Sequence, residues 1–282
     1  MQLHIFARFC AALFLQAVVA SAFAAPTVKD VSFVNGQNIQ ITAKLYLPDS
    51  AYSPSPVAVL MHGCSGVYSY SDPARGIAVL YREWATRLNN AGYAALLVDS
   101  FTPRNVKQNQ CDNGAVGVSE INDRPFDAYA AQKYLSQQRT IDAARIVLIG
   151  WSHGASSTLA TLSDTMVKPG EKPYKAGYAF YPGCGLFNAF GGIATSTYKP
   201  YVPLTILHGD ADPLYQSTYC QQRIDKSMTL GVNNFSMTVF SGAQHSFDMA
   251  RSAVSPWTIY DLNAKMSADS MVMQSLLETF RK

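Results

Sequence analysis

The sequence predicts an α/β domain in which helices cover both faces of a mostly parallel β-sheet. Short apolar runs alternate along the chain with stretches of helical spacing, and glycine, proline or polar residues bound each run. The chain has 282 residues, of which 48% are hydrophobic, which is enough for a sizeable core. We expect a single domain over residues 25–282, because α/β folds of this length are often undivided.

The N-terminal segment is predicted to be a signal peptide, residues 1–24, and not part of the fold. Arg8 supplies a positive charge, residues 9–23 are almost entirely apolar, and Ala22-Phe23-Ala24 is typical of a cleavage site. An uncleaved membrane anchor is the alternative, but it needs about 20 apolar residues and this run is shorter. We therefore expect a periplasmic or secreted protein without stable membrane insertion after cleavage.

Seven strands and five helices are predicted after this segment. The first strand, Ile39 to Leu47, alternates between apolar and polar residues like an antiparallel edge strand. The later strands are short apolar runs: Val57 to Met61, Ala94 to Asp99, Ile146 to Gly150, Ala176 to Tyr181, Leu204 to His208 and Phe235 to Phe240. The helices are Ile77 to Asn90, Pro125 to Gln138, Ser156 to Thr165, Ser217 to Leu230 and Asp269 to Arg281.

The strongest local signal is Gly150-Trp151-Ser152-His153-Gly154, which directly follows a buried strand and precedes a helical stretch. This is the context of a nucleophile elbow, so Ser152 is the predicted nucleophile. Glycine is favoured two residues either side of the serine because side chains there would crowd the tight turn. A chain of this length contains Gly-x-Ser-x-Gly by accident roughly once in ten times, and the strand-to-helix context lowers that rate.

A base and an acid are expected in the order serine, acid, histidine that folds with this elbow use. His245 lies in the loop after the last strand, whereas His208 ends a strand and precedes the best-placed acids. His245 is therefore the predicted base; the alternative is an ordinary loop histidine. Asp212 is the predicted acid in preference to Asp210, which comes early enough in its loop to stabilise a turn.

Acyl transfer also needs N–H donors for an oxyanion, and His62-Gly63-Cys64-Ser65-Gly66 follows a strand where such a loop is expected. The backbone N–H groups of Cys64 and His153 are the candidate pair. For His62 we expect a packed side chain that shapes this loop rather than an acid–base role.

These motifs resemble the dienelactone hydrolase-like branch of the α/β-hydrolases. The resemblance implies an α/β-hydrolase fold with about eight strands, no large lid, and hydrolysis of a small ester or lactone. It covers nearly all of the chain after residue 24 and rests on His62 to Gly66, Asp99 to Arg104, Arg124 to Tyr129, the elbow, Tyr181-Pro182-Gly183-Cys184-Gly185, and the Asp212 and His245 loops.

One departure from this family concerns the nucleophile. Dienelactone hydrolase itself resembles this chain but uses cysteine where Ser152 stands, and the acidic residue of its oxyanion-side loop corresponds here to Gly63. A general serine esterase is therefore expected, rather than a specific dienelactone hydrolase.

Candidate substrate contacts follow the predicted carboxyl ends of the strands, where pockets form in open α/β sheets. The aromatic residues at these positions are Trp151, Phe101, Tyr181, Phe187 and Tyr215, and about half of them are expected to fill the core instead. Arg104 either binds a substrate carboxylate or forms an ion pair within the protein.

Four cysteines remain after removal of Cys10 with the signal peptide, an even set in an oxidising compartment. We predict disulfides Cys64 to Cys111 and Cys184 to Cys220, because each pair follows two strands expected to be neighbours. The loop-entropy model gives the Cys64 to Cys111 bridge a stabilisation on the order of 4 kcal/mol.

Composition argues against several other functions. The net charge of +3 is small and no run of Lys or Arg occurs, so nucleic acid is an unexpected partner. No Cys-x-x-Cys pair or histidine cluster is present, so we predict no metal and no cofactor. The expected partner is a small-molecule ester or lactone, with the oligomeric state left open. The alternatives are a serine peptidase of the same fold and a non-catalytic binding protein that keeps the fold.

Overall fold

The computed structural model describes residues 27–49, 52–69, 76–106, 117–167, 170, 173–249 and 259–281. The predicted signal peptide and Cys111 lie outside these residues.

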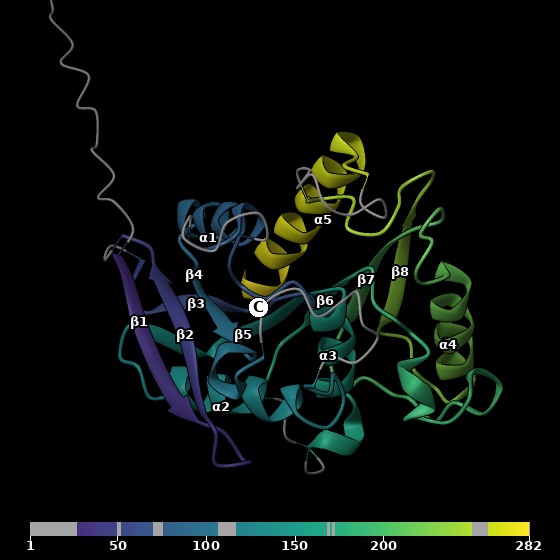
Figure 1. The fold of residues 1–282 in the computed structure, drawn as a ribbon, viewed down its shortest axis with the longest axis horizontal. Coiled ribbons are helices and arrows are strands. Elements are labelled where there is room, and N and C mark those ends of the chain that lie inside the picture. Colours follow the sequence, from purple (N-terminus) through teal and green to yellow (C-terminus); the bar gives the residue numbers. More distant parts are fainter. Residues whose placement is uncertain are drawn as a thin grey trace, which may run out of the picture.

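Eight strands form one mixed sheet in the order β1-β2-β4-β3-β5-β6-β7-β8 (Figure 1). The strands are β1 (Thr27–Val34), β2 (Gln40–Leu47), β3 (Ser55–Met61), β4 (Ala94–Asp99), β5 (Ile141–Trp151), β6 (Gly177–Phe180), β7 (Leu204–Gly209) and β8 (Phe235–Phe240). β2 pairs antiparallel with both β1 and β4, and every other neighbouring pair is parallel. The predicted α/β fold with a mostly parallel sheet is confirmed.

The edge of the sheet differs from the prediction. Ile39 to Leu47 is predicted to form an edge strand, but β2 lies between β1 and β4, and β1 forms the edge at this end of the sheet. β1 was not predicted because seven of its eight residues are exposed or half-buried, with Phe33 the buried exception. A strand without one buried face has no clear hydrophobic alternation, and it is the backbone ladder with β2 that fixes its register.

Two hydrophobic layers separate the sheet from its helices. On one face lie α1 (Val79–Asn90) and α5 (Leu262–Arg281), and on the other lie α2 (Arg124–Ser136), α3 (His153–Thr161) and α4 (Ser217–Thr229) (Figure 1). Along β3, Val59 and Met61 join the core beneath α2 and α3, while Ala58 and Leu60 join the core beneath α1 and α5. This alternation is why β3, buried at every position, reads as a continuous apolar run.

Four short 3₁₀ helices complete the described elements: Thr102–Arg104, Asp164–Met166, Leu186–Asn188 and Ile193–Thr195. Two helices begin at least three residues before the predicted start: α3 begins at His153, directly after Ser152, and not at Ser156, and α5 begins at Leu262 and not at Asp269. Among the described residues, no helix combines the length and the apolar character needed to cross a bilayer.

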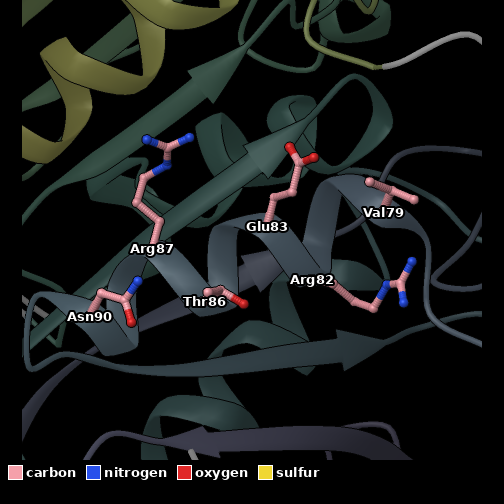
Figure 2. Close-up of a pocket in the computed structure, with 6 residues that line it drawn as sticks. All are labelled: Val79, Arg82, Glu83, Thr86, Arg87 and Asn90. Carbon is pink, nitrogen blue, oxygen red and sulfur yellow. The ribbon is translucent and has the colours of Figure 1, made fainter. Parts of the chain in front are cut away.

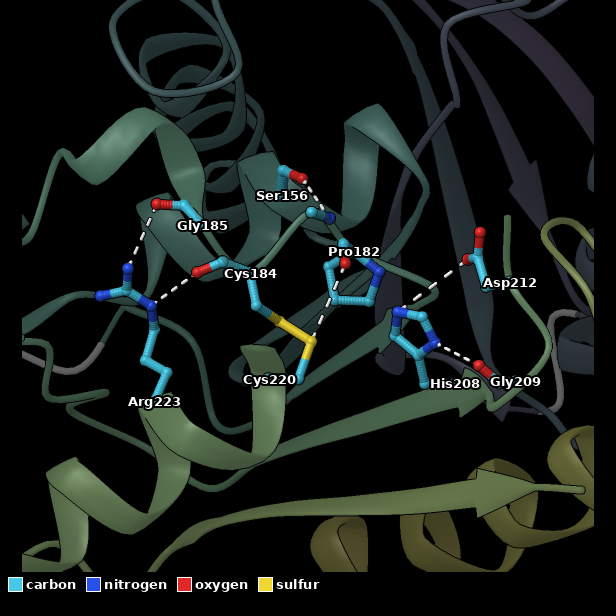
Figure 3. Close-up of a disulfide and its surroundings, with 10 residues drawn as sticks. Ser156, Pro182, Cys184, Gly185, His208, Gly209, Asp212, Cys220 and Arg223 are labelled. Atoms are coloured by element: carbon cyan, nitrogen blue, oxygen red, sulfur yellow. Dashed lines mark hydrogen bonds and ion pairs between the residues drawn. A yellow bond between two sulfur atoms is a disulfide. The ribbon is translucent and has the colours of Figure 1, made fainter. Parts of the chain in front are cut away.

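A disulfide joins Cys184, in the loop after β6, to Cys220 on α4 (Figure 3). This is one of the two predicted pairs, and the two cysteines do follow neighbouring parallel strands, β6 and β7. The other pair includes Cys111, which lies outside the described residues, so Cys64 to Cys111 stays a prediction.

Candidate active site

Ser152 occupies a sharp turn between β5 and α3. Its backbone angles, φ +51° and ψ −115°, are ones that non-glycine residues rarely adopt, and such strain persists only where the surroundings enforce it. A β-carbon at Gly150 would lie 2.2 Å from the Gly154 carbonyl oxygen, and one at Gly154 would lie 2.1 Å from the Met61 carbonyl oxygen. The predicted steric need for both glycines is confirmed.

The turn brings the Ser152 hydroxyl to His245, and His245 to Asp212. Nε2 of His245 lies 2.9 Å from Oγ of Ser152, and Nδ1 of His245 lies 2.7 Å from Oδ2 of Asp212. The three side chains come from the elbow, the loop after β8 and the loop after β7, and all three residues are buried, Ser152 keeping only 8% exposure. Since the carboxylate can only accept, Nδ1 carries the proton, which leaves Nε2 free to accept the serine proton.

The Asp212 carboxylate is fixed from both sides. Its Oδ1 accepts hydrogen bonds from the backbone N–H groups of Leu214 and Tyr215, at 2.8 and 3.0 Å. Burial acts to raise the pKa of Asp212, but the hydrogen bonds from His245 and from these N–H groups outweigh it and lower the pKa below its usual value. The carboxylate therefore stays charged, as a partner of the imidazolium must.

Asp210, the alternative acid, has a different role in the same loop. Its Oδ1 accepts a hydrogen bond from the backbone N–H of Gly242 at 2.6 Å, and the residue is exposed. The structure thus brings Asp212, and not Asp210, to His245.

His208 lies behind the Asp212 carboxylate (Figure 3). Its Nε2 is 4.0 Å from Oδ2 of Asp212, and its Nδ1 donates to the Gly209 carbonyl oxygen at 2.9 Å. The residue is fully buried, and burial is the main cause of a lowered His208 pKa. The order of residues along the chain argued against His208 as the base. The sequence did not predict its proximity to Asp212, because this contact forms only when the loop folds back over the end of β7.

On the other side of Ser152 lies the loop that follows β3. A β-carbon at Gly63 would be 3.7 Å from Cβ of Ser152, so this loop directly adjoins the nucleophile candidate, with Cys64 the next residue. The Gly63 N–H donates to the hydroxyl of Tyr81 on α1 at 2.9 Å, a contact that the sequence did not predict. The predicted donors, Cys64 and His153, therefore come from the two segments that flank Ser152.

His62 shapes this loop, as expected. Its Nε2 accepts from the Ser100 N–H at 3.2 Å, so Nδ1 carries the proton and donates to the Gly63 carbonyl oxygen at 2.6 Å. Burial lowers the His62 pKa well below its usual value. His62 is a neutral connector between the ends of β3 and β4.

Three of the predicted aromatic substrate contacts are packed inside the protein. Trp151, Phe101 and Tyr181 are at most 1% exposed. The Trp151 indole N–H and the Tyr181 hydroxyl donate to the two oxygens of Asp248, at 2.9 and 2.6 Å, and the Tyr181 ring lies 4.8 Å from the His245 ring. These side chains support the elbow and the His245 loop from within the core, and this role fits their burial better than contact with substrate.

Arg104 forms an ion pair within the protein. Its guanidinium donates to both oxygens of the fully buried Asp127 at 2.8 and 2.9 Å, and to the Ser100 carbonyl oxygen at 2.8 Å. This geometry occupies the fork that would grip a substrate carboxylate, so the second of the two expected roles fits the structure.

Two polar residues lie near the candidate site, of which the sequence singled out Tyr215 and not Glu120. The Tyr215 ring lies 5.5 Å from the His245 ring and is 37% exposed. Glu120 lies near the hydroxyl of Ser156, which is one turn along α3 from Ser152. Burial raises the pKa of Glu120 to about 7. No motif marks Glu120, because its proximity to the elbow depends on loop packing.

One pocket, of about 570 Å³, lies along α1 and is lined by residues that include Arg82, Glu83 and Arg87 (Figure 2). Arg87 is already paired with Asp269 at 2.8 Å, and Glu83 with Lys265 at 3.2 Å. In the part of the chain that the structure describes, no group of three or more His, Cys, Asp or Glu side chains could hold a metal ion.

Comparison with known proteins identifies a family and solved structures that this chain resembles. The model of the dienelactone hydrolase family matches residues 41–282. A dienelactone hydrolase-like promiscuous phosphotriesterase from metagenomic libraries superposes with a TM-score of 0.70 at 20% identity, over 91% of this chain and 99% of that one. A putative dienelactone hydrolase from Klebsiella pneumoniae superposes with a TM-score of 0.69 at 15% identity, over 90% and 99%.

A curated relative is the probable dipeptidyl-aminopeptidase B of Phaeosphaeria nodorum, 25% identical over 210 residues. The match covers 64% of this chain, and the chain spans 22% of that protein's length.

Proposed function

Because the chain belongs to the dienelactone hydrolase family, we propose that it is a serine hydrolase that cleaves a carboxylic ester or lactone through an acyl-Ser152 intermediate. The observation that carries this proposal is the continuous chain of hydrogen bonds from Ser152 through His245 to Asp212, at 2.9 and 2.7 Å. This spacing matches the reach expected of a nucleophile, its base and the group that orients the base.

In the first half of the reaction, Oγ of Ser152 attacks the ester carbonyl while its proton passes to Nε2 of His245. The resulting imidazolium is stabilised by the charged Asp212. When the tetrahedral intermediate collapses, the bond to the alkoxy oxygen breaks, and His245 returns the proton to the leaving alcohol. A water molecule then repeats these steps against the acyl-serine, which releases the acid and restores Ser152.

The backbone N–H groups of Cys64 and His153 are the proposed donors to the oxyanion. Two features support this assignment. His153 is the first residue of α3, where backbone N–H groups lack intrahelical partners and the helix dipole favours negative charge. Cys64 directly follows Gly63, which lies against Ser152. Preorganised donors of this kind are usually the largest contribution to acyl transfer.

Export of the protein belongs to the same proposal. The predicted signal peptide and the Cys184 to Cys220 disulfide both favour a compartment outside the cytoplasm. N-terminal sequencing of the protein purified from cells tests this directly, and a mature chain that starts at Ala25 is the expected result.

The nucleophile is tested with a serine-directed phosphonate probe and a panel of p-nitrophenyl esters of increasing acyl length. Wild-type protein is expected to be labelled on Ser152 and to turn over short esters, whereas Ser152→Ala is expected to lose both activities and keep its fold. Ser156→Ala provides a matched control, since Ser156 lies one turn further along α3 and its hydroxyl accepts from the Gly183 N–H within the fold. Full turnover by folded Ser152→Ala would exclude the proposed mechanism.

A serine peptidase is the second candidate, favoured by the similarity to the dipeptidyl-aminopeptidase. The same triad would cleave amides, so substrates decide between the two. Dipeptidyl p-nitroanilides and the matching p-nitrophenyl esters should be assayed side by side. We expect turnover of the esters only, and efficient cleavage of the anilides would favour the peptidase.

A further inference from the structure

Arg124 contacts the side chain of His153, whose backbone N–H is a proposed oxyanion donor, and its environment is unusual. It is the first residue of α2 and is fully buried. Its Nη1 lies 2.8 Å from Nδ1 of His153, and its guanidinium lies 5.6 Å from the centre of the Phe101 ring. None of the described residues accepts a hydrogen bond from its Nε or Nη2.

The contact with Arg124 fixes which nitrogen of the His153 ring carries the proton. A guanidinium has only donors, so Nδ1 of His153 must be an unprotonated acceptor. The neutral ring then carries its proton on Nε2, which lies 3.1 Å from the Val118 carbonyl oxygen and donates to it. Burial and the positive charge of Arg124 both lower the His153 pKa well below its usual value, which keeps the ring neutral.

Stability alone gives little reason to bury this guanidinium. No carboxylate among the described residues forms a salt bridge with Arg124, and burial lowers its pKa to about 10 although the negative charges of Asp127 and Glu120 act to raise it. The nearby Asp127 is already paired with Arg104. A buried charge with unmet donors costs free energy, and well-packed apolar residues of similar volume are often as stable or more so.

The arrangement does give the His153 backbone a fixed position. The ring is bonded at one end to α2 and at the other to the turn at Val118, and the Phe101 ring packs edge-on against it at 5.7 Å. Because His153 directly follows Ser152, a fixed ring restricts rotation of the peptide group between these two residues. That peptide group carries the N–H proposed to bind the oxyanion.

We propose that Arg124 is a positioning residue of the oxyanion hole, which acts by bonding the neutral, Nε2-protonated ring of His153 and so fixing the His153 N–H. The buried positive charge also favours the negative charge that develops on the substrate oxygen. This inference rests on the proposed serine hydrolase activity. It assigns Arg124 a role in the rate of acyl transfer, and not in substrate affinity.

The test compares three variants that separate the charge from the hydrogen bond. Arg124→Lys keeps a charge and a donor, Arg124→Gln keeps a neutral donor, and Arg124→Met keeps neither. Arg223→Met is the matched control: Arg223 is also fully buried, but it donates to the Cys184 and Gly185 carbonyl oxygens. Ester hydrolysis is measured per competent site, counted by titration with the phosphonate probe.

For Arg124→Met we expect kcat to fall by about 10²-fold, the lower range for loss of an oxyanion donor, with KM changed less than about 3-fold. Arg124→Gln and Arg124→Lys are expected to fall between Met and wild type, since each keeps part of the interaction. Arg223→Met is expected to lower the melting temperature and leave kcat per site within about 2-fold of wild type.

Nitrogen-15 NMR of the His153 ring gives a readout independent of activity. In wild type we expect an unprotonated Nδ1 that does not titrate between about pH 5 and pH 9, and in Arg124→Met a mixture of tautomers. Protonated Nδ1 in wild type overturns the proposal without any variant. A kcat within about 2-fold of wild type in folded Arg124→Met also overturns it. Should the Met variant not fold, the protonation of Nδ1 in the wild-type ring decides. Retained turnover in Ser152→Ala would instead overturn the proposed function itself.

Discussion

Replacing Asp212 with asparagine should disable His245 without displacing it. Two backbone N–H groups, from Leu214 and Tyr215, bond Oδ1 of Asp212 and would retain the amide oxygen of asparagine at that position. The amide NH2 would then face Nδ1 of His245, 2.7 Å away, and only an unprotonated Nδ1 could accept from it. The ring proton would move to Nε2, where it blocks transfer of the Ser152 proton.

The expected loss in kcat is about 10⁴-fold, as for a triad acid replaced in this way. At about 1.36 kcal/mol per factor of ten, this raises the barrier by about 5.4 kcal/mol. The KM should change little, because the Asp212 side chain points to His245 and not to substrate. Initial rates with a p-nitrophenyl ester, normalised to titrated sites, measure the effect.

Asp210→Asn is the matched control from the same loop. Its Oδ1 only accepts from the Gly242 N–H, and the amide oxygen of asparagine can accept the same bond. We expect less than about a 3-fold change in kcat. A loss of less than about 10-fold in Asp212→Asn, or a larger loss in Asp210→Asn, would refute the reasoning.

Three further predictions concern stability. Gly154→Ala should lower the free energy of unfolding by at least about 2 kcal/mol in urea titrations, because the new β-carbon would lie 2.1 Å from the Met61 carbonyl oxygen; unchanged stability would contradict the close approach of α3 to the end of β3. Replacing Cys184 and Cys220 with alanine should lower the free energy of unfolding by about 4 kcal/mol in the same titrations, because the disulfide closes a loop with a sequence separation of 36 residues. Burial raises the pKa of Asp248 to about 6, so its stabilising contribution is full below about pH 4 and is lost as the pH rises through about 6. The free energy of unfolding of wild type, relative to that of Asp248→Asn, should therefore decrease as the pH is raised from about 4 to about 6 in denaturation curves. A difference that does not change with pH would contradict the raised pKa of Asp248.

The sequence determined the features that depend on local pattern. Buried parallel strands such as β3 and β4 are continuous apolar runs, and the elbow is a short motif whose glycines are demanded by contacts within the motif and with the end of β3. The order of serine, acid and histidine along the chain then selected His245, and position within the loop favoured Asp212 over Asp210. Each of these inferences uses residues whose chemistry and spacing are explicit in one stretch of sequence.

The tertiary structure decided what depends on packing between distant segments. Whether Arg104 meets a substrate or Asp127, and whether Trp151 lines a pocket or bonds to Asp248, is set by helices and loops that meet only on folding. β1 was missed because an exposed edge strand is specified by its ladder with β2 and not by its own hydrophobic pattern. The contact of Arg124 with His153 is of the same kind. The role of a buried polar side chain depends on its hydrogen-bond partner, and spacing in the sequence does not identify that partner.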